Sequence, residues 1–333
     1  MAHVDLNLEL EHAVAAVRAA ATLCREAQQN LANAATLEKK DHSPVTVADF
    51  ASQALVCAAL RDTSRVKAVV GEEDAADLRE PSNAAIRDRV VEHVRALRGP
   101  AVSADQTLAW IDIGSATPDA STPLYWTLDP IDGTKGFLRG AHYAIALALL
   151  HEGGVVLGVL GCPNLEGPDS QPGALLAAVR GQGASLLPLA GEGLAGRRPI
   201  RVSSVTHPAD TRFCESVESG HSDQEQSAKI AARLGICGDP VRLDGQTKYA
   251  IVARGEVSIY LRLPRRKDYR EKIWDHAAGM IVVEEAGGRV TDAMGKPLDF
   301  SRGRHLEANG GIVATNGPIH DEVLGAVGEF AQR

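Results

Sequence analysis

A short apolar run, Trp126-Thr-Leu128, leads directly into the acidic segment Asp129-Pro-Ile-Asp-Gly-Thr134. The run is typical of a β-strand, and Pro130 stiffens the segment after it because its ring fixes φ. Asp132 follows Asp129 by three residues, so a tight turn can direct both carboxylates at one point. If a helix begins at Thr134, its N-terminus suits a phosphate. The segment therefore predicts a strand that ends in a combined metal and phosphate site, which is the layout expected of a phosphoryl-hydrolysing enzyme.

Three more acidic residues lie where predicted strands end or predicted helices begin, the positions at which α/β folds gather ligands. Asp49 lies in the first turns of a helix, Glu72 lies at the end of a strand, and Asp275 opens a helix just after Trp274. Carboxylates that share one point repel one another unless a cation neutralises them. A ligand set made of oxygens selects hard cations such as Mg²⁺ or Mn²⁺.

The spacing of apolar residues and the positions of Gly and Pro along the chain predict an α+β first half and an α/β second half. In the first half we expect helices over 5–35, 46–60 (with Thr46 as N-cap) and 83–98, and strands over 68–70, 126–128, 142–162 (as a hairpin) and 174–179. Residues 99–123 are expected to be loose, and the Gly/Pro-rich stretch 181–199 indicates a domain boundary, which gives domains 1–197 and 198–333. In the second half we expect strands over 200–204, 212–217, 240–243, 257–263, 288–292 and 311–315, and helices over 222–234, 246–254, 274–286 and 318–331.

Composition limits the class of protein. Of 333 residues, 44% are hydrophobic and 23% are charged, which suits a globular protein with a sizeable core. The formal net charge of −8 disfavours non-specific binding to nucleic acid or to an anionic membrane. We expect no membrane span and no secretory signal, and the five scattered cysteines are typical of reduced, buried thiols. By default these features predict a cytoplasmic protein.

Four motifs occur in the order in which they occur in one family. They are Ser43-Pro-Val-Thr-Val-Ala-Asp49 with Gln53, Gly71-Glu-Glu73, Asp129-Pro-Ile-Asp-Gly-Thr134, and Trp274-Asp-His-Ala-Ala-Gly279 followed by Glu285-Ala-Gly-Gly288. With these motifs the chain resembles the lithium-sensitive inositol monophosphatase superfamily. The resemblance implies a five-layered α-β-α-β-α sandwich.

Within that superfamily the chain is most similar to the 3'(2'),5'-bisphosphate nucleotidases. The stretches with this likeness are Ser43–Gln53, Asp129–Gly140, Val156–Asn164, Tyr260–Pro264 and Tyr269–Asp275. The resemblance implies an Mg²⁺-dependent phosphatase that removes the 3'-phosphate of adenosine 3',5'-bisphosphate by in-line attack of a metal-activated water, giving AMP and phosphate. It also implies possible action on 3'-phosphoadenylyl sulfate, a place in sulfur metabolism and inhibition by Li⁺.

The resemblance implies a role for each motif residue. Two or three Mg²⁺ ions would be held by Glu72, Asp129, Asp132, Asp275 and the carbonyl of Ile131, with Asp49 reaching a third, weaker ion or its water. Asp49 and Thr134 would orient and deprotonate the attacking water, and Glu73 would orient a water or another ligand.

Substrate recognition is expected from residues further along the chain. Six of the eleven residues in 262–272 are basic, which suits a clamp on a second phosphate. By resemblance, the substrate contacts are Gly133, Thr134, His221, Lys248 and Arg262. Gly245 departs from relatives, which have Ser there, and the missing hydroxyl removes a hydrogen bond worth ~1 kcal/mol.

Two alternatives stay open at this point. An inositol monophosphate or 1,4-bisphosphate phosphatase shares the same core motifs and differs only in the recognition region. A catalytically silent nucleotide sensor or scaffold predicts the loss of a metal ligand or of Thr134, and all of these residues are present. The sequence shows no interpretable interface patch, and we expect a monomer or a homodimer.

Overall fold

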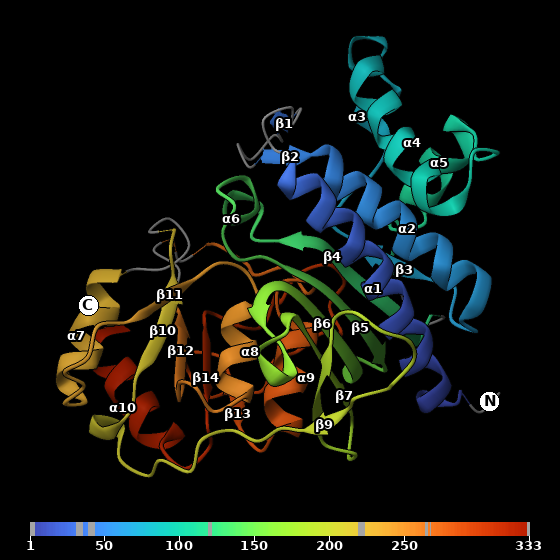
Figure 1. Cartoon of the computed structure of the whole chain (residues 1–333). Helices are drawn as coiled ribbons and strands as arrows, with labels where there is room; N and C mark the ends of the chain where they lie inside the picture. Colours follow the sequence, from blue (N-terminus) through green and yellow to red (C-terminus); the bar gives the residue numbers. More distant parts are fainter. Residues whose placement is uncertain are drawn as a thin grey trace.

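The computed structural model describes residues 4–30, 36–38, 44–118, 122–218, 224–263, 266 and 268–331. Its helices and strands are arranged around two β-sheets (Figure 1). Within the described ranges we find no helix that combines the length and the apolar character needed to cross a lipid bilayer.

The larger sheet has seven strands in sequence order, and neighbouring strands are antiparallel except for the first two. Its strands are β3 (Val69–Gly71), β4 (Leu124–Asp132), β5 (Ala144–His151), β6 (Gly154–Glu166), β7 (Pro172–Val179), β8 (Ala184–Pro188) and β9 (Arg198–Pro199). The helices of this part are α1 (Leu6–Gln29), α2 (Val47–Thr63), α3 (Ala76–Arg79), α4 (Ala84–Arg98), α5 (Ala104–Asp112) and α6 (Thr134–Leu138). A separate antiparallel pair, β1 (Thr36–Glu38) and β2 (Pro44–Thr46), precedes α2.

The smaller sheet has five strands in the order β11-β10-β12-β14-β13. The first three strands in this order are parallel, and β14 and β13 extend the sheet antiparallel. The strands are β10 (Phe213–Ser216), β11 (Val241–Leu243), β12 (Ile259–Arg262), β13 (Arg289–Thr291) and β14 (Ile312–Thr315). The helices are α7 (Gln224–Arg233), α8 (Thr247–Ala253), α9 (Ala277–Glu285) and α10 (His320–Ala331).

The two faces of each sheet bury different sets of side chains, because successive residues of a strand point in opposite directions. In β5, Ile145 and Leu147 pack with α1 and α2, whereas Ala146 and Leu150 belong to the core shared with α8 and α9. The helices α7 and α10 cover the other face of the smaller sheet. The layers are therefore helix, sheet, helix, sheet, helix, which confirms the predicted five-layered sandwich (Figure 1).

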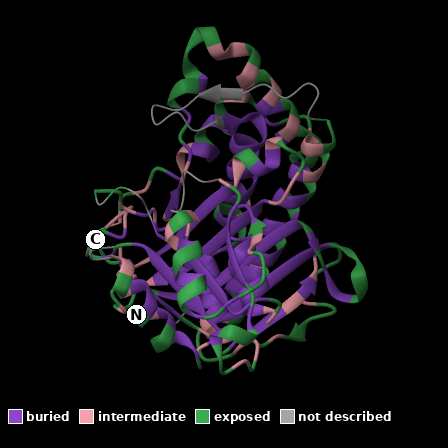
Figure 2. Ribbon diagram, turned by 90° about the vertical axis from the view of Figure 1, so that its left-hand side faces the viewer, coloured by how far each residue is buried: buried purple, intermediate pink, exposed green. Residues whose placement is uncertain are grey.

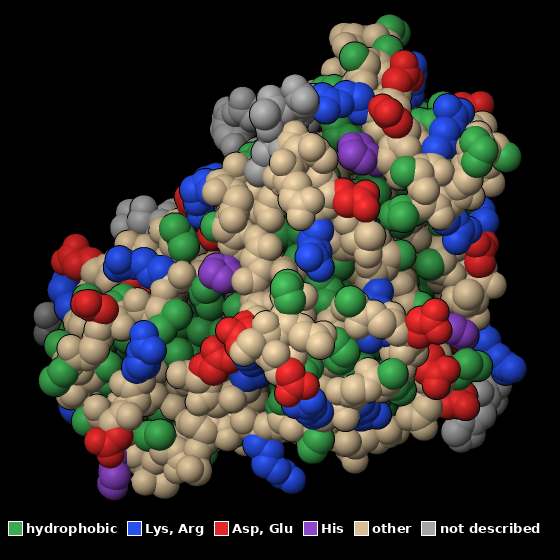
Figure 3. All heavy atoms as spheres, viewed as in Figure 1, with side chains coloured by type: hydrophobic (Ala, Val, Ile, Leu, Met, Phe, Trp, Pro, Cys, Tyr) green, Lys and Arg blue, Asp and Glu red, His purple; other side chains and the backbone are tan. Residues whose placement is uncertain are grey.

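Burial is uneven across these layers. Figure 2 shows buried residues throughout the stacked sheets, whereas the region of α3, α4 and α5 at the top is largely exposed or intermediate. Figure 3 shows acidic and basic side chains interspersed on the face drawn there. Among the described residues of that face, no basic stripe of the kind that follows a nucleic-acid backbone is visible.

Two expectations about local structure were wrong, those for residues 99–123 and for residues 200–204. Residues 104–112 form α5, because Ser103 caps the helix by accepting from the backbone N–H of Gln106 (3.1 Å) and Trp110 and Ile111 are buried. The stretch 181–199, predicted as a domain boundary, contains β8 and β9, which join the larger sheet, and the boundary itself stays a prediction. No strand forms over 200–204, since Ile200 bonds to β8 and Val202 bonds to the end of α9.

Candidate active site

A pocket between the end of β4, α6 and the smaller sheet brings most of the predicted site residues together. Its wall includes the predicted metal ligands Glu72, Asp129, Ile131, Asp132 and Asp275, and the predicted substrate contacts Gly133, Thr134, Lys248 and Arg262. Asp49 lies directly behind Thr134. The pocket therefore combines carboxylates, which suit a cation, with ammonium and guanidinium groups, which suit phosphate.

A β-bulge explains how Asp129 and Asp132 both reach this pocket. Asp129 of β4 is paired with Ala146 of β5, and Asp132 is paired with Ala144. An advance of three residues along β4 therefore corresponds to an advance of only two along β5. In a regular strand, residues an odd number of steps apart point to opposite faces. The extra residue of a bulge changes that alternation and redirects a side chain. The bulge replaces the tight turn that the sequence predicts at this position.

Thr134 and Asp49 are in contact, as the resemblance implies. The Thr134 hydroxyl lies 3.4 Å from Oδ1 of Asp49 and 3.2 Å from the carbonyl oxygen of Ile131. The other carboxylate oxygen of Asp49 accepts from the backbone N–H of Thr46 (2.8 Å) and from its hydroxyl, which completes a capping box at the start of α2. Asp49 is therefore fixed by its own helix while it faces Thr134.

Two buried side chains of α2 hold the ligand segments in place. Gln53 clamps Glu73 from both sides, since its Oε1 accepts from the Glu73 backbone N–H (3.0 Å) and its Nε2 donates to the Glu73 carbonyl oxygen. Ser52 donates to the carbonyl oxygen of Pro130 (3.0 Å), inside the bulge. One helix thus fixes both the segment of Glu72 and the segment of Asp132. Glu73 is itself buried behind the pocket, at 5% exposure.

The electrostatics of the carboxylates fit a divalent cation. Burial, with a contribution from Glu72, raises the pKa of Asp132 to about 6, although Lys248 and Arg262 act in the opposite direction. Burial also raises the pKa of Asp275 to about 7, and repulsion from Asp132 adds to this effect. A raised pKa means that the ionised form of these carboxyl groups is unfavourable unless a cation is near. Carboxylate oxygens are also the donors that Mg²⁺ prefers.

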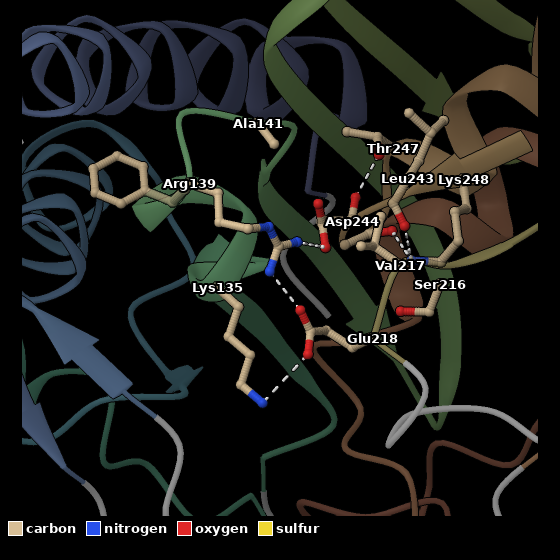
Figure 4. Close-up of polar contacts among 12 residues, drawn as sticks. Lys135, Arg139, Ala141, Ser216, Val217, Glu218, Leu243, Asp244, Thr247 and Lys248 are labelled. Carbon is tan, nitrogen blue, oxygen red and sulfur yellow. Dashed lines mark hydrogen bonds and ion pairs between the residues drawn. The ribbon is translucent and has the colours of Figure 1, made fainter.

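Lys248 lies at the beginning of α8, and its ammonium group is held by the loop before that helix. Its Nζ donates to the carbonyl oxygens of Gly245 (2.7 Å) and Leu243 (3.3 Å), as Figure 4 shows, and lies 5.4 Å from the centre of the Tyr260 ring. Burial lowers the pKa of Lys248, while the carboxylate of Asp132 opposes that effect. A buried ammonium group in the pocket wall is suited to an anionic group of a ligand.

Arg262 is held at the end of β12 by the carboxylates of Glu271 and Asp275. Its Nε lies 2.8 Å from Oε2 of Glu271, and an Nη lies 3.5 Å from Asp275. Behind Glu271, the ring of His276 contacts both that carboxylate (Nε2, 3.1 Å) and the hydroxyl of Tyr249 (Nδ1, 2.9 Å). This arrangement fixes the direction of the Arg262 guanidinium. His276 thus supports Glu271 from behind.

Ion pairs at the pocket rim connect α6 with the smaller sheet (Figure 4). Arg139 pairs with Asp244 (2.8 Å) and with Glu218, and Lys135 lies 3.6 Å from the same Glu218. Two glycines allow this close approach. A Cβ at Gly136 would lie 2.5 Å from a carboxylate oxygen of Asp244, and one at Gly133 would lie 3.0 Å from the backbone nitrogen of Gly245.

Several other sequence expectations can be located. His221, a predicted substrate contact, lies outside the described residues. Four of the five cysteines are buried as predicted, Cys162 of β6 among them, but the prediction is wrong for Cys237, which is exposed. Asp275 lies in the turn that precedes α9 rather than at the first residue of that helix.

Sequence reasoning missed the residues that support the site from behind. Gln53 and Glu271 were part of the quoted motifs but had no assigned role. Gln246 was not singled out, although its side chain donates to the carbonyl oxygen of Trp274 (2.8 Å) and accepts from the backbone N–H of Gly279 (2.8 Å). Gln53, a polar residue within the Ala- and Leu-rich part of its motif, carried a signal that could have found it. Glu271, between Arg270 and Lys272, and Gln246, outside the quoted motifs, carried none.

Comparisons with known proteins agree with this fold. The Inositol monophosphatase family model matches residues 5–331. Among solved structures, an inositol monophosphatase from Anabaena superposes with a TM-score of 0.65 at 22% identity, covering 98% of this chain and 97% of its own. The extragenic suppressor protein suhB from Bartonella henselae has a TM-score of 0.66 at 20% identity, covering 95% of this chain and 96% of its own.

Similar proteins with curated names are more closely related in sequence. A protein of Oryza sativa named 3'(2'),5'-bisphosphate nucleotidase is 45% identical over 96% of this chain and 93% of its own length. A protein of Schizosaccharomyces pombe with the same name is 42% identical over 97% and 96%. With this match over nearly its whole length, and with the layered fold and pocket described above, the chain belongs to the inositol monophosphatase family.

Proposed function

We propose that this protein is a Mg²⁺-dependent 3'(2'),5'-bisphosphate nucleotidase that hydrolyses the 3'-phosphate of adenosine 3',5'-bisphosphate to AMP and phosphate. 3'-Phosphoadenylyl sulfate is a second expected substrate, because it presents the same 3'-phosphate. The observation on which the proposal depends is the pairing, in one pocket, of a carboxylate set with two cations, the buried Lys248 and the partly buried Arg262. The names of relatives at 42–45% identity support the same substrate class.

The residues present suit two separate tasks. Glu72, Asp129, Asp132, Asp275 and the carbonyl of Ile131 would hold two or three Mg²⁺ ions. When bound, these ions would neutralise charge on the scissile phosphate and make a nearby water more acidic. Lys248 and Arg262 lie in the same wall and would bind the phosphate that does not react.

Thr134 and Asp49 would handle the proton of the attacking water. The Thr134 hydroxyl lies within reach of Oδ1 of Asp49 (3.4 Å) and of the carbonyl oxygen of Ile131 (3.2 Å). When it donates to Asp49, its oxygen lone pairs can accept from a water in the pocket. As the water attacks, its proton can pass to Thr134 while the Thr134 proton passes to Asp49. Because the capping box fixes Asp49, this path needs little rearrangement.

Gly133 and the backbone of α6 complete the phosphate side of the pocket. Gly133 has φ of +96°, a conformation that glycine adopts without strain, and it turns the chain from β4 into α6. We propose that Gly133 and Thr134 contact the scissile phosphate. His221 is a further proposed contact from the sequence.

The test is phosphate release in the presence of Mg²⁺, with adenosine 3',5'-bisphosphate, inositol 1-phosphate and inositol 1,4-bisphosphate at equal concentrations. We expect kcat/KM for the nucleotide to exceed both others by about a hundredfold, which corresponds to ~2.7 kcal/mol of transition-state binding. Omission of Mg²⁺ should abolish release, and millimolar Li⁺ should inhibit it. Faster turnover of an inositol phosphate would overturn the nucleotide assignment while leaving the metal site as proposed.

A further inference from the structure

We infer that Arg304 is a positioning residue. It holds the segments of Glu72 and Asp275 in fixed positions relative to each other and thereby strengthens the binding of Mg²⁺. These two proposed ligands come from opposite parts of the chain, the larger sheet and the turn before α9. The inference rests on the proposed metal ligands but does not depend on which phosphate ester is the substrate.

Arg304 touches the residue immediately before each of these ligands. Its Nη2 donates to the carbonyl oxygen of Gly71, which precedes Glu72 at the end of β3. Its guanidinium carbon lies 4.7 Å from the centre of the ring of Trp274, which precedes Asp275. A planar guanidinium can donate at its edge and stack through its face at the same time, and a lysine ammonium cannot do both with one fixed geometry.

Each end of this link is itself firmly anchored. The backbone of Arg304 accepts from Ile273 N–H (3.1 Å), and Leu306 N–H donates to the carbonyl oxygen of Glu271 (2.9 Å), so Arg304 is fixed to the segment that leads into Asp275. At the other end, Gly71 N–H donates to the carbonyl oxygen of Gly114 (2.7 Å) while β3 pairs with β4. Movement of one ligand segment relative to the other would therefore break contacts of Arg304.

The positive charge of Arg304 and its proposed positioning role predict opposite effects of its loss on the affinity for Mg²⁺. Burial lowers the pKa of Arg304, and the carboxylates of Asp74 and Glu72 favour its charged form. A positive charge beside Glu72 repels Mg²⁺, so charge alone would make the loss of Arg304 tighten metal binding. Positioning requires the reverse, because groups that orient metal ligands typically contribute 10–100-fold in affinity.

The experiment measures Mg²⁺ binding by isothermal titration calorimetry on chelator-treated full-length protein, with no substrate present. Arg304→Met removes the Gly71 contact and the charge while keeping an unbranched chain over Trp274. We expect its Kd for Mg²⁺ to rise at least about tenfold over wild type. Arg304→Lys keeps the charge and should weaken binding by a smaller factor, and it replaces the Met variant if that variant does not fold. Arg302→Met is the matched control, because Arg302 is an exposed arginine that pairs with Asp299 (2.8 Å).

The outcomes separate the possible roles of Arg304. Weaker Mg²⁺ binding by Arg304→Met, with Arg302→Met unchanged, supports the inference. Unchanged or tighter binding by a folded Arg304 variant overturns it, and so does a variant whose only defect is a lower Tm of the metal-free protein. Because no nucleotide is used, failure of the substrate assignment would leave this result intact.

Discussion

The carboxylate of Glu271 lies between Arg262 and His276, with Oε2 at 2.8 Å from Nε of Arg262 and 3.1 Å from Nε2 of His276. Burial alone would raise the pKa of Glu271, but the charge of Arg262 and the hydrogen bond from His276 hold it at about 2. Glu271 is therefore a fixed anion at neutral pH. It determines where the guanidinium of Arg262 points, although it does not line the pocket itself.

Glu271→Gln should weaken recognition of the phosphate that does not react. The amide keeps the shape but loses the charge, so Arg262 is less firmly oriented. We expect KM for adenosine 3',5'-bisphosphate to rise about tenfold, equivalent to ~1.4 kcal/mol, with a smaller change in kcat. KM for 3'-AMP, which lacks the second phosphate, should change much less. Glu307→Gln, at a half-exposed carboxylate, is the control, and an equal rise in KM for both substrates would contradict this role.

Thr134→Ala should reduce kcat by about a hundredfold or more, with little change in KM. The variant removes the hydroxyl that lies 3.4 Å from Asp49, and a positioned proton-transfer group typically contributes 10²–10⁴-fold. Thr134→Ser restores the hydroxyl and should recover most of the activity. Steady-state kinetics of phosphate release measure both variants, and wild-type kcat in the alanine variant would rule out the proposed proton path.

Because His320 is buried in its neutral form, the free energy of unfolding should fall in mild acid. Its ring is fully buried between the hydroxyls of Thr291 (3.0 Å) and Thr315 (2.9 Å), and burial lowers its pKa to about 4. The unfolded chain therefore binds a proton between pH 6.5 and 4 that the folded protein does not bind. The contribution to the free energy of unfolding is fully present above pH 6.5 and falls by about 3 kcal/mol as the pH drops to 4.

Urea unfolding at a series of pH values measures this contribution. His320→Gln should have a flatter dependence of the free energy of unfolding on pH between 6.5 and 4, whatever its stability at pH 7. His207→Gln, at an exposed histidine, should keep the wild-type slope. A slope that is the same in all three proteins would mean that other groups cause the acid destabilisation.

Local sequence signals predicted most of the fold because they act over a few residues. Thr46 is the predicted N-cap of α2, and the apolar runs from residue 142 to residue 162 form β5 and β6. Failures occurred where the decisive contacts are distant in sequence. The two-residue strand β9 exists only because Ser185 and Leu186 of β8 lie beside it. The division into domains 1–197 and 198–333, the oligomeric state and the cytoplasmic location stay predictions.

For the site, too, the sequence predicted what depends on neighbouring residues and missed what depends on contacts between distant segments. The quoted motifs contain the predicted metal ligands that line the pocket, whereas Lys248 and Gly245 line it from outside those motifs. The bulge at Asp132 and the supports from Gln246 and Arg304 depend on how separate segments pack, and one sequence does not specify those contacts. Arg304 in particular lies 29 residues after Asp275, outside every quoted motif.

Gly245 shows how the structure changes an expectation. From the sequence, its difference from the serine of relatives implied only a missing hydrogen bond to the ligand. In the structure Gly245 has φ of +58°, and a Cβ there would lie 2.1 Å from the carbonyl oxygen of Asp132. The glycine therefore allows the loop before α8 to lie directly against the segment of a proposed metal ligand.

Gly245→Ser should consequently impair the site rather than improve nucleotide binding. Because both the Cβ and the positive φ are unfavourable, we expect the free energy of unfolding to fall by about 1–3 kcal/mol. Displacement of the Asp132 segment should also weaken Mg²⁺ binding, measured by calorimetry without substrate. Gly238→Ser is the matched control, since a Cβ at that exposed position meets nothing within 4 Å. A serine variant with wild-type stability and lower KM for the nucleotide would instead mean that the loop can adopt a second arrangement, in which the hydroxyl faces the ligand.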